Sequence, residues 1–258
     1  MIAVFSEDTN EIKLLMQKVE ILSHQSWGKT TIYIASLNNV QFLIVESGYA
    51  KVNLGVAAGL ACNAYKVDKI IGMGDCGCLR SRGAKPGNVA VAQTSRQYDV
   101  DFSPLGYQPS LIVGLSSPQY PCNAELVALA QKEAKALNIP YITANFGSAD
   151  RFLANGDDFY QLSQEFGFDC VDTETGAIGE FAFINSIPYV YVKGISNYGD
   201  DNAAEMYEHY RTAAYERACH VVYHMPSRTA STIMIILIFF FCSIQPSLPS
   251  LRIPAMSA

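Results

Sequence analysis

The feature that most constrains the fold is a strand–helix–strand pattern late in the chain. Residues 170–171 form a short apolar run, apolar residues at 177–184 recur at helical spacing, and residues 190–195 alternate as in a buried strand. This order predicts a βαβ unit with parallel strands. Open α/β sheets bind ligands at the carboxyl ends of their strands, which is where Glu174 and Asn197 are placed. The pattern therefore predicts a site that these two residues share.

The rest of the chain also alternates between strand and helix patterns. Strands are predicted at residues 2–5, 31–35, 40–46, 69–72, 89–93 and 141–145, and helices at 12–22, 52–65, 125–137, 157–166 and 203–224. With 258 residues and 50% hydrophobic content, the chain is long enough to bury one sizeable core. The expected fold class is α/β, in a single domain that covers residues 1–225.

Charge, cysteine usage and the N-terminal sequence bound the cellular setting. The net charge of −6 argues against nucleic acid as a partner, because phosphate backbones attract basic surfaces. Seven cysteines occur without paired spacing, which suits a reducing compartment better than a disulfide framework. Residues 1–11 have neither a basic segment nor a long apolar one, so a strand is predicted there rather than a signal peptide. The expected location is cytoplasmic.

The composition changes abruptly after Met225. Residues 229–244 are almost entirely apolar, yet a membrane span needs about twenty such residues and at least about seventeen. We therefore expect residues 226–258 to form a hydrophobic tail outside the domain, either disordered or packed on it, rather than a membrane anchor. Truncation after Met225 is expected to leave a folded domain.

Two short motifs suggest a cofactor or a metal, and both interpretations are rejected. Residues 72–77 match G-x-G-x-x-G after a strand, but the following segment, 79–87, does not predict the helix that a bound dinucleotide requires. The glycines are instead predicted to let the backbone approach a ligand closely. Cys76 and Cys78 lack a second Cys/His pair at zinc spacing. No cofactor and no metal are predicted.

Five segments together resemble one enzyme family over nearly the whole chain to Met225. They are SGYAKVN at 47–53, GDCG at 74–77, YDVDFSPLGY at 98–107, SADRF at 148–152 and VDTE at 171–174. They resemble the nucleoside phosphorylase and nucleosidase superfamily, and within it most closely the 5'-methylthioadenosine/S-adenosylhomocysteine nucleosidases. The resemblance implies a single-domain three-layer α/β/α sandwich around a central mixed, mostly parallel twisted sheet.

The resemblance also implies roles for particular residues. Breaking an N-glycosidic bond leaves an oxocarbenium-like sugar and a purine anion, and the site must stabilise both. Glu11 is matched to the glutamate that orients or deprotonates water, and Glu174 to the carboxylate that accepts the ribose hydroxyls. Phe152 is matched to the residue that stacks on the base, and the Leu153 backbone to the group that reads the purine edge. The other expected substrate contacts are Asp75, Cys76, Gly77, Leu105, Asp172 and Thr173.

Without the resemblance, each of these residues has a plainer interpretation. Glu11 and Glu174 could equally be carboxylates near a helix N-terminus, where the helix dipole favours them. Phe152 alone would more readily be a core residue. Only their joint occurrence favours a site.

The loop Asp99–Tyr107 is the most telling match. In the nucleosidases a similar loop builds part of the dimer interface and of the 5'-substituent pocket, and purine phosphorylases lack it. A homodimer through this loop and a purine nucleoside as the small-molecule partner are therefore expected. The predicted activity is N-ribosyl hydrolysis of purine nucleosides, of the type that cleaves 5'-methylthioadenosine or S-adenosylhomocysteine in methionine salvage.

Two residues depart from the family pattern. Asp75 stands where relatives carry serine or threonine, and Asn197 stands where the nucleosidases carry the aspartate that protonates the base. An amide cannot transfer a proton, but it can donate to N7 or O6 or accept through its carbonyl, so adenine and 6-oxopurines both remain open. Asp200 or Asp201 could take over the acid role. A phosphorylase and a weakly active binding or storage protein are the alternative functions.

Phosphorolysis is the less favoured of these alternatives. Phosphorylases of the superfamily hold phosphate with an arginine and a serine, at the positions of Gly72 and Asp75 here. A missing cation and an added carboxylate disfavour a phosphate dianion in a partly buried site. Water is therefore the predicted nucleophile.

Overall fold

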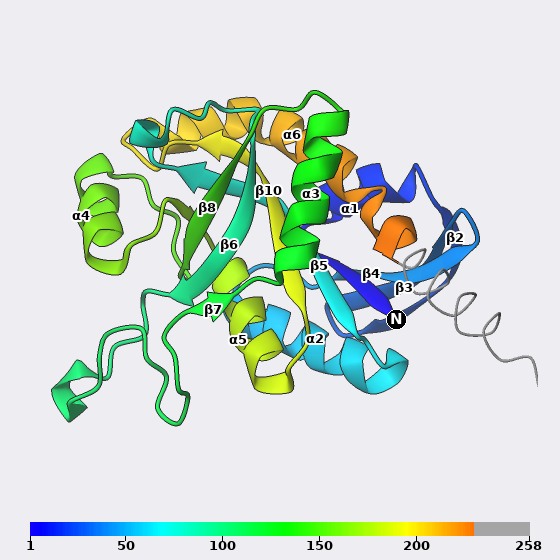
Figure 1. Ribbon diagram of the computed structural model, residues 1–258, viewed down its shortest axis with the longest axis horizontal. Coiled ribbons are helices and arrows are strands. Elements are labelled where there is room, and N and C mark those ends of the chain that lie inside the picture. Colours follow the sequence, from blue (N-terminus) through cyan, green and yellow to red (C-terminus); the bar gives the residue numbers. More distant parts are fainter. Residues whose placement is uncertain (230–258) are drawn as a thin grey trace, which may run out of the picture.

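One mixed sheet runs through the protein in the computed structural model, which describes residues 1–229 (Figure 1). Its strands are β1 (Ile2–Ser6), β2 (Glu20–Trp27), β3 (Thr30–Leu37), β4 (Val40–Glu46), β5 (Lys69–Cys78), β6 (Val89–Gln97), β7 (Tyr120–Pro121), β8 (Tyr141–Ser148), β9 (Cys170–Asp172) and β10 (Tyr189–Asn197). The hydrogen-bonded order is β10-β6-β8-β9-β5-β1-β4-β3-β2, with β7 on β6. Because β10 also pairs with β5, the strands from β10 through β6, β8 and β9 to β5 close on themselves.

Helices cover both faces of the sheet. They are α1 (Thr9–Met16), α2 (Lys51–Tyr65), α3 (Ala124–Ala136), α4 (Gly156–Phe166), α5 (Thr175–Asn185) and α6 (Ala203–Val222). Helices α2 and α5 contribute to the core cluster on one face, and α1, α3 and α6 contribute to the cluster on the other. The predicted α/β class, with helical layers on either side of a mixed sheet, is confirmed.

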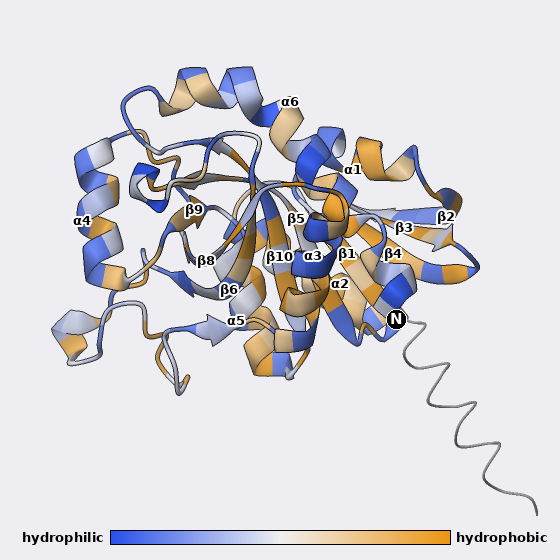
Figure 2. Cartoon of the chain, turned by 45° about the horizontal axis from the view of Figure 1, so that its top comes forward, coloured by the Kyte–Doolittle hydropathy of each residue, from blue (hydrophilic) through white to orange (hydrophobic). Residues whose placement is uncertain are grey.

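The apolar pattern of each strand follows its place in the sheet. Every residue of β10 and of β1 is buried, as expected for strands that helices cover on both faces. The edge strand β2 is mostly exposed. Coloured by hydropathy, the inner strands are largely hydrophobic, whereas the helices alternate between polar and apolar residues (Figure 2).

The expected parallel βαβ unit does not form, although its three elements do. Strand β9 pairs parallel with β8 and antiparallel with β5, whereas β10 pairs parallel with β5 and antiparallel with β6. The prediction was wrong because β5 is long enough to pair with β10 along most of its length and with β9 at its end.

Two further segments differ from the sequence prediction. Helix α1 ends at Met16 rather than at residue 22, and residues 20–27 form the strand β2. The sequence did not predict β2, because an edge strand that is exposed on both faces carries no apolar alternation. Strand β5 was predicted to end at Gly72 but continues to Cys78. Its first glycine is needed for packing, since a Cβ at Gly72 would lie 2.1 Å from the ring of Tyr191.

The described chain continues a few residues beyond α6. Met225 is fully buried in a core cluster, and Nε of Arg228 lies 2.8 Å from Oε1 of the buried Glu133. No helix within residues 1–229 is long and apolar enough to cross a membrane. The predicted hydrophobic tail falls almost entirely on residues 230–258, which lie outside the described part. The domain boundary at residue 225 stays a prediction.

Candidate active site

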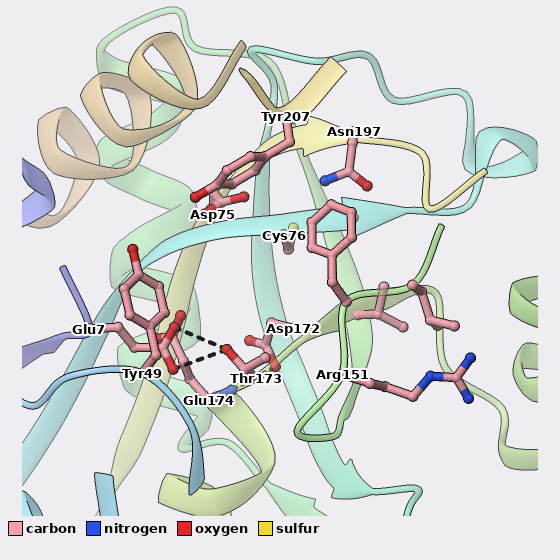
Figure 3. Close-up of a pocket in the computed structure, with 14 residues that line it drawn as sticks. Glu7, Tyr49, Asp75, Cys76, Arg151, Asp172, Thr173, Glu174, Asn197 and Tyr207 are labelled. Atoms are coloured by element: carbon pink, nitrogen blue, oxygen red, sulfur yellow. Dashed lines mark hydrogen bonds between the residues drawn. The ribbon is translucent and has the colours of Figure 1, made fainter. Parts of the chain in front are cut away.

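A pocket opens where β5, β9 and β10 end, beside the connection from β1 to α1 (Figure 3). Its lining residues are Glu7, Tyr49, Asp75, Cys76, Gly77, Arg151, Phe152, Leu153, Val171, Asp172, Thr173, Glu174, Asn197 and Tyr207. Residues far apart in the sequence meet here because the ends of three strands converge. The pocket is the place where the sequence predicted a ligand, at the ends of the sheet strands.

The base of the pocket is organised around a buried lysine. Lys193 lies on β10 and is fully buried. Its Nζ donates to Oε1 of Glu174 and lies 3.5 Å from Oδ2 of Asp172. A buried ammonium is stable only when paired, so these two carboxylates are what allow a lysine in the interior of β10.

Glu7 is a further carboxyl group of the pocket, beside Glu174. Thr173 Oγ1 lies 3.0 Å from each of its carboxyl oxygens, and the backbone N–H of Ala50 donates to Oε1 at 3.3 Å. Glu7 also shares a hydrogen bond with Glu174. Sequence reasoning missed Glu7, because attention to the family match singled out Glu11. Its position directly after β1, at the same edge of the sheet as Glu174, was the available signal.

Glu11 lies beneath the pocket rather than on its surface. It is 2% exposed and accepts a hydrogen bond from the Ser6 hydroxyl. A Cβ on Gly74 would lie 3.0 Å from Oε1 of Glu11, 3.2 Å from Oε1 of Glu174 and 2.9 Å from Nζ of Lys193. Gly74 thus leaves the space in which these three charged groups converge.

Burial changes the protonation of this group of residues. Burial, followed by the charge of Glu174, raises the pKa of Glu7 to about 11, and the same causes raise the pKa of Glu11 well above its usual value. Burial also raises the pKa of Glu174 to about 7, against the lowering effect of Lys193. One lysine cannot balance the four carboxyl groups gathered around it, so the site holds protons at neutral pH. These residues, Glu7, Glu11, Asp172, Glu174 and Lys193, are called the carboxylate floor below.

The opposite end of the pocket holds Asp75 and Asn197 (Figure 3). Ser196 Oγ donates to Oδ2 of Asp75 and accepts from Nδ2 of Asn197 at 2.9 Å. The backbone N–H of Gly199 donates to Oδ1 of Asn197 at 2.8 Å. Burial raises the pKa of Asp75, against the lowering effect of its hydrogen bonds from Ser196 and Tyr215.

Aromatic side chains surround the opening, and we call Tyr49, Phe152 and Tyr207 the aromatic rim. Phe152 is 53% exposed and packs edge-on against Tyr207, with ring centroids 5.7 Å apart. Tyr49 is 52% exposed and donates from its hydroxyl to Oδ2 of Asp8 at 2.9 Å. Exposed aromatic faces beside a polar pocket are suited to stacking on a flat, conjugated ligand.

Residues 1–225 match the family described as the phosphorylase superfamily. The chain belongs to this superfamily. It is 25% identical over 225 residues to the 5'-methylthioadenosine/S-adenosylhomocysteine nucleosidase of Haemophilus ducreyi, covering 87% of this chain and 96% of that protein. It is 29% identical over 173 residues to the nucleosidase of the same name from a Buchnera aphidicola strain, covering 67% and 74%. Both of these relatives of the chain are nucleosidases.

Solved structures share the fold of this superfamily member. The nucleosidase from Neisseria meningitidis in complex with methylthio-immucillin-A aligns with a TM-score of 0.83 at 23% identity, covering 87% of this chain and 97% of that one. The futalosine hydrolase of Helicobacter pylori aligns with a TM-score of 0.83 at 20% identity, covering 88% and 97%. The predicted resemblance to the superfamily, and to its nucleosidases, is confirmed.

The structure brings most of the predicted site residues together. The pocket is lined by Asp75, Cys76, Gly77, Phe152, Leu153, Asp172, Thr173, Glu174 and Asn197. Glu11 lies one layer below them. Leu105 is not brought to the pocket, because it is 72% exposed at a short 3-10 turn, Ser103–Leu105, in the loop that projects from the body of the protein (Figure 1).

Proposed function

We propose that this chain is a purine nucleoside N-ribosyl hydrolase, of the type that cleaves 5'-methylthioadenosine or S-adenosylhomocysteine to the free base and the 5'-thio-ribose. One observation carries the proposal. Glu174 is 3% exposed and lines the pocket, and its Oε2 accepts from no backbone N–H, alcohol or ammonium group of the described chain, while the carboxyl group of Glu7 shares a hydrogen bond with the same carboxylate. In the proposal a ribose hydroxyl is the better donor to this oxygen, and ribose supplies two neighbouring ones.

The carboxylate floor supports cleavage with positive charge on the sugar. As the N-glycosidic bond breaks, positive charge grows on the ribose ring, and a nearby carboxylate stabilises it more strongly than it stabilises the substrate. Glu174 fills this role in the proposal. Glu7 faces the pocket and Glu11 supports it from below. Because burial raises both pKa values, this carboxyl pair must first release a proton to solvent, and its ionised member would then take the proton of the water that attacks C1'. The bond to the base breaks, and its electron pair leaves with the base.

The aromatic rim and its neighbours would hold the purine. Phe152 offers an exposed face for stacking, and base–aromatic stacking contributes about 1–3 kcal/mol per base. The side chain of Leu153 is buried in a core cluster, so the backbone at this position is the part that can face a ligand. Asn197 offers an amide at the same end of the pocket.

The charges of the pocket favour water over phosphate as the nucleophile. Lys193 is committed to Glu174 and Asp172, and Nη2 of Arg151 lies 3.2 Å from Oδ2 of Asp158. Among the described lining residues, no other lysine or arginine is present. A phosphate dianion would meet several carboxyl groups and no uncommitted cation, which costs several kcal/mol in a partly buried site.

A weakly active member that binds nucleosides without efficient turnover is the second candidate. Asn197 favours it, because an amide cannot protonate the departing base, and loss of general acid catalysis typically costs 10²–10⁴ in rate. Asp75 carries the only other carboxyl group at that end of the described pocket.

A homodimer completes the proposal. The loop 98–107 and the N-terminal part of α2 expose large apolar side chains: Val52, Val56, Phe102, Leu105 and Tyr107. The two segments are tied together, because Nζ of Lys51 lies 2.6 Å from Oδ1 of Asp99. Neighbouring exposed apolar groups mark an interaction surface. A second copy seated there would bring its own loop toward the open side of the pocket.

The test is product analysis with the purified full-length chain. Methylthioadenosine, S-adenosylhomocysteine, adenosine and inosine are incubated with and without phosphate, and bases and sugars are separated by chromatography. We expect free base and free sugar without phosphate, and a fall of about 10²–10³ in rate for Glu174→Gln. Glu165→Gln, an exposed glutamate on α4, is the matched control.

Three results would contradict parts of the proposal. Release that depends on phosphate and yields ribose 1-phosphate would establish a phosphorylase. Tight nucleoside binding without release would establish the binding protein. A Glu174→Gln variant as active as Glu165→Gln would remove Glu174 from the site.

A further inference from the structure

We propose that Asp75 is the general acid of this site, and that it gives its proton to the purine as the bond between C1' and N9 breaks. The inference rests on the proposed function and adds a catalytic residue to it. It assigns to a residue of β5 the proton that the amide of Asn197, on β10, cannot supply. Figure 3 shows Asp75 beside Tyr207, on the side of the pocket that Asn197 occupies and away from the carboxylate floor.

Asp75 carries the only carboxyl group at that end of the described pocket. The other lining carboxyl groups belong to the carboxylate floor, and they are Glu7, Asp172 and Glu174. Asp200 and Asp201 follow β10 in the sequence, but neither lines the pocket. Asp200 is paired with Arg80 instead, with its Oδ2 2.6 Å from Nη2. Among the described residues, Asp75 is therefore the carboxyl group that can reach a base held by the aromatic rim.

A chain of hydrogen bonds connects Asn197 to Asp75. Oδ1 of Asn197 accepts from the backbone N–H of Gly199 at 2.8 Å, and Nδ2 donates to Oγ of Ser196 at 2.9 Å. Ser196 in turn donates to Oδ2 of Asp75. The chain thus runs from the amide to the carboxyl group, and each bond in such a chain strengthens the next. Asn197 supports the acid in this arrangement and does not replace it.

The surroundings of Asp75 suit both of its protonation states. In the neutral acid, Oδ2 accepts from Ser196, so the proton is carried by Oδ1 and is available for transfer. In the carboxylate that remains after the transfer, Ser196 still donates to Oδ2, and Tyr215 supplies a second hydroxyl donor. Hydrogen bonds to a charged group are stronger than those to a neutral one, so these donors stabilise the charge as it forms.

Burial keeps the proton on Asp75 before the reaction. It raises the pKa of Asp75, against the lowering effects of the Ser196 hydrogen bond and of the charge on Lys193. The carboxyl group of Asp172 raises the pKa further, and Tyr215 lowers it. Asp75 therefore holds its proton at a higher pH than an ordinary aspartate does, which is the direction that a general acid requires.

Proton transfer from Asp75 makes the departing base neutral. The bond between C1' and N9 breaks, and its electron pair stays on the purine. The proton of Asp75 goes to N7, and Asp75 becomes a carboxylate. The attacking water gives its hydroxyl group to C1' and its other proton to the ionised member of the Glu7 and Glu11 pair. That proton then returns to solvent and Asp75 takes one from solvent, so no further reactant is consumed.

The test compares a leaving group that needs a proton with one that does not. The purified full-length chain is given the purine nucleoside that it cleaves fastest and, separately, 4-nitrophenyl β-D-ribofuranoside, whose nitrophenolate leaves without protonation. We expect Asp75→Asn to lower kcat/KM for the nucleoside by about 10²–10⁴ and for the nitrophenyl riboside by less than about threefold. Glu174→Gln should slow both reactions, because both substrates present the ribose hydroxyls.

The ratio of the two rates is the deciding quantity, because a loss of folded protein alone lowers both rates equally. Asp75→Asn keeps the size of the side chain, and Asp75→Ser is a second variant for which we expect the same change in the ratio. Asp157→Asn, at an exposed aspartate of α4, is the matched control and should leave both rates unchanged.

The outcomes separate this inference from the proposed function. Equal losses for the two substrates in the Asp75 variants, or no loss for either, would overturn the acid role and leave the hydrolase standing. A parent chain that cleaved the nitrophenyl riboside but no purine nucleoside would also lack the acid. Phosphate-dependent cleavage with the expected ratio would overturn hydrolysis and retain Asp75 as the acid. Cleavage of neither substrate would overturn both.

Discussion

The carboxylate floor and the aromatic rim of the pocket are built on opposite principles. The floor comes from the interior of β10, from the end of β9 and the residues after it, and from the residues that follow β1, and its charged side chains are buried around Lys193. The rim comes from the loops before α2 and α4 and from α6, and two of its three rings are more than half exposed. The floor is complete within one chain, whereas the rim leaves apolar surface open.

The difference shows how stability and binding are divided within the site. Removing a buried, paired charge costs more free energy of folding than removing an exposed ring. An exposed ring contributes when a ligand or a second copy covers it. Floor variants are therefore expected to change both folding and chemistry, and rim variants to change binding alone.

The largest expected effect follows from removing the cation of the floor. Lys193→Met leaves Glu174 and Asp172 buried without their shared partner, which typically costs about 3–5 kcal/mol of unfolding free energy. Urea unfolding at neutral pH measures it. Lys29→Met, at an exposed lysine between β2 and β3, is the control and is expected to stay within about 0.5 kcal/mol of the parent. Equal unfolding midpoints for the two variants would mean that the pairs of Lys193 with Glu174 and Asp172 do not contribute to the stability of the folded protein.

The second effect is a dependence of stability on pH. The folded-state pKa of Glu7, about 11, lies above its ordinary value of 4.5, so folding takes up a proton that the unfolded chain has lost. The contribution of Glu7 to the stability of the folded protein is fully present below pH 4.5 and is lost as pH rises toward 11. Glu174 adds to the loss between pH 4.5 and about 7. The slope for one proton is at most about 1.4 kcal/mol per pH unit.

Glu7→Gln tests this linkage by removing one titrating group while keeping its size. Thermal unfolding is recorded at pH 6, 7 and 8 for the parent and for the variant. We expect the melting temperature of the parent to fall with rising pH, and that of the variant to fall less. Parallel curves would show that Glu7 is ionised in the folded protein.

The third effect belongs to the rim. Phe152→Ala removes an exposed ring, so the melting temperature should change little, while nucleoside affinity should fall about tenfold if the ring stacks on the base. Tyr160→Ala, at another exposed aromatic residue, is the control and is expected to leave both quantities unchanged. A large loss of stability in the Phe152 variant would place this residue with the floor rather than the rim.

Part of the site could be predicted from the sequence, because several of its residues lie at strand ends. Glu174 of the floor and Asn197 at the opposite end of the pocket were placed at the ends of predicted strands, and both line the pocket. The charge pairing could not be foreseen. Lys193 fits the alternation of an ordinary strand with a solvent-facing lysine, and only the burial of β10 on both faces makes it an interior cation.

The errors in the fold also have physical causes. The parallel βαβ prediction failed because strand pairing depends on the arrangement of the whole sheet and not on neighbouring elements alone. Strand β5 pairs with β10 along most of its length and with β9 at its end. Strand β2 was missed because its residues are exposed on both faces and show no period of two. Leu105 was matched through the family loop, but the arrangement of that loop depends on contacts that a local motif does not specify.

The smallest effect concerns the point where floor and rim meet, at the start of α2. Ala50 has φ 75° and ψ 156°, a conformation that is essentially restricted to glycine and typically costs about 1–3 kcal/mol. It follows the rim residue Tyr49, and its N–H is directed at Glu7 of the floor. Ala50→Gly should relieve this strain. Glycine also makes the unfolded chain more flexible, which costs about 0.4–1 kcal/mol, so the unfolding free energy should rise by about 1 kcal/mol in total. That corresponds to a rise of about 2–4 °C in melting temperature. Gly48→Ala, at φ 79° where a Cβ would make only ordinary contacts with Asn53 at 3.6 Å or more, is the matched reverse change and should lower the melting temperature. If Ala50→Gly lowered the melting temperature instead, the methyl group of Ala50 would stabilise the start of α2 by its packing rather than strain the backbone there.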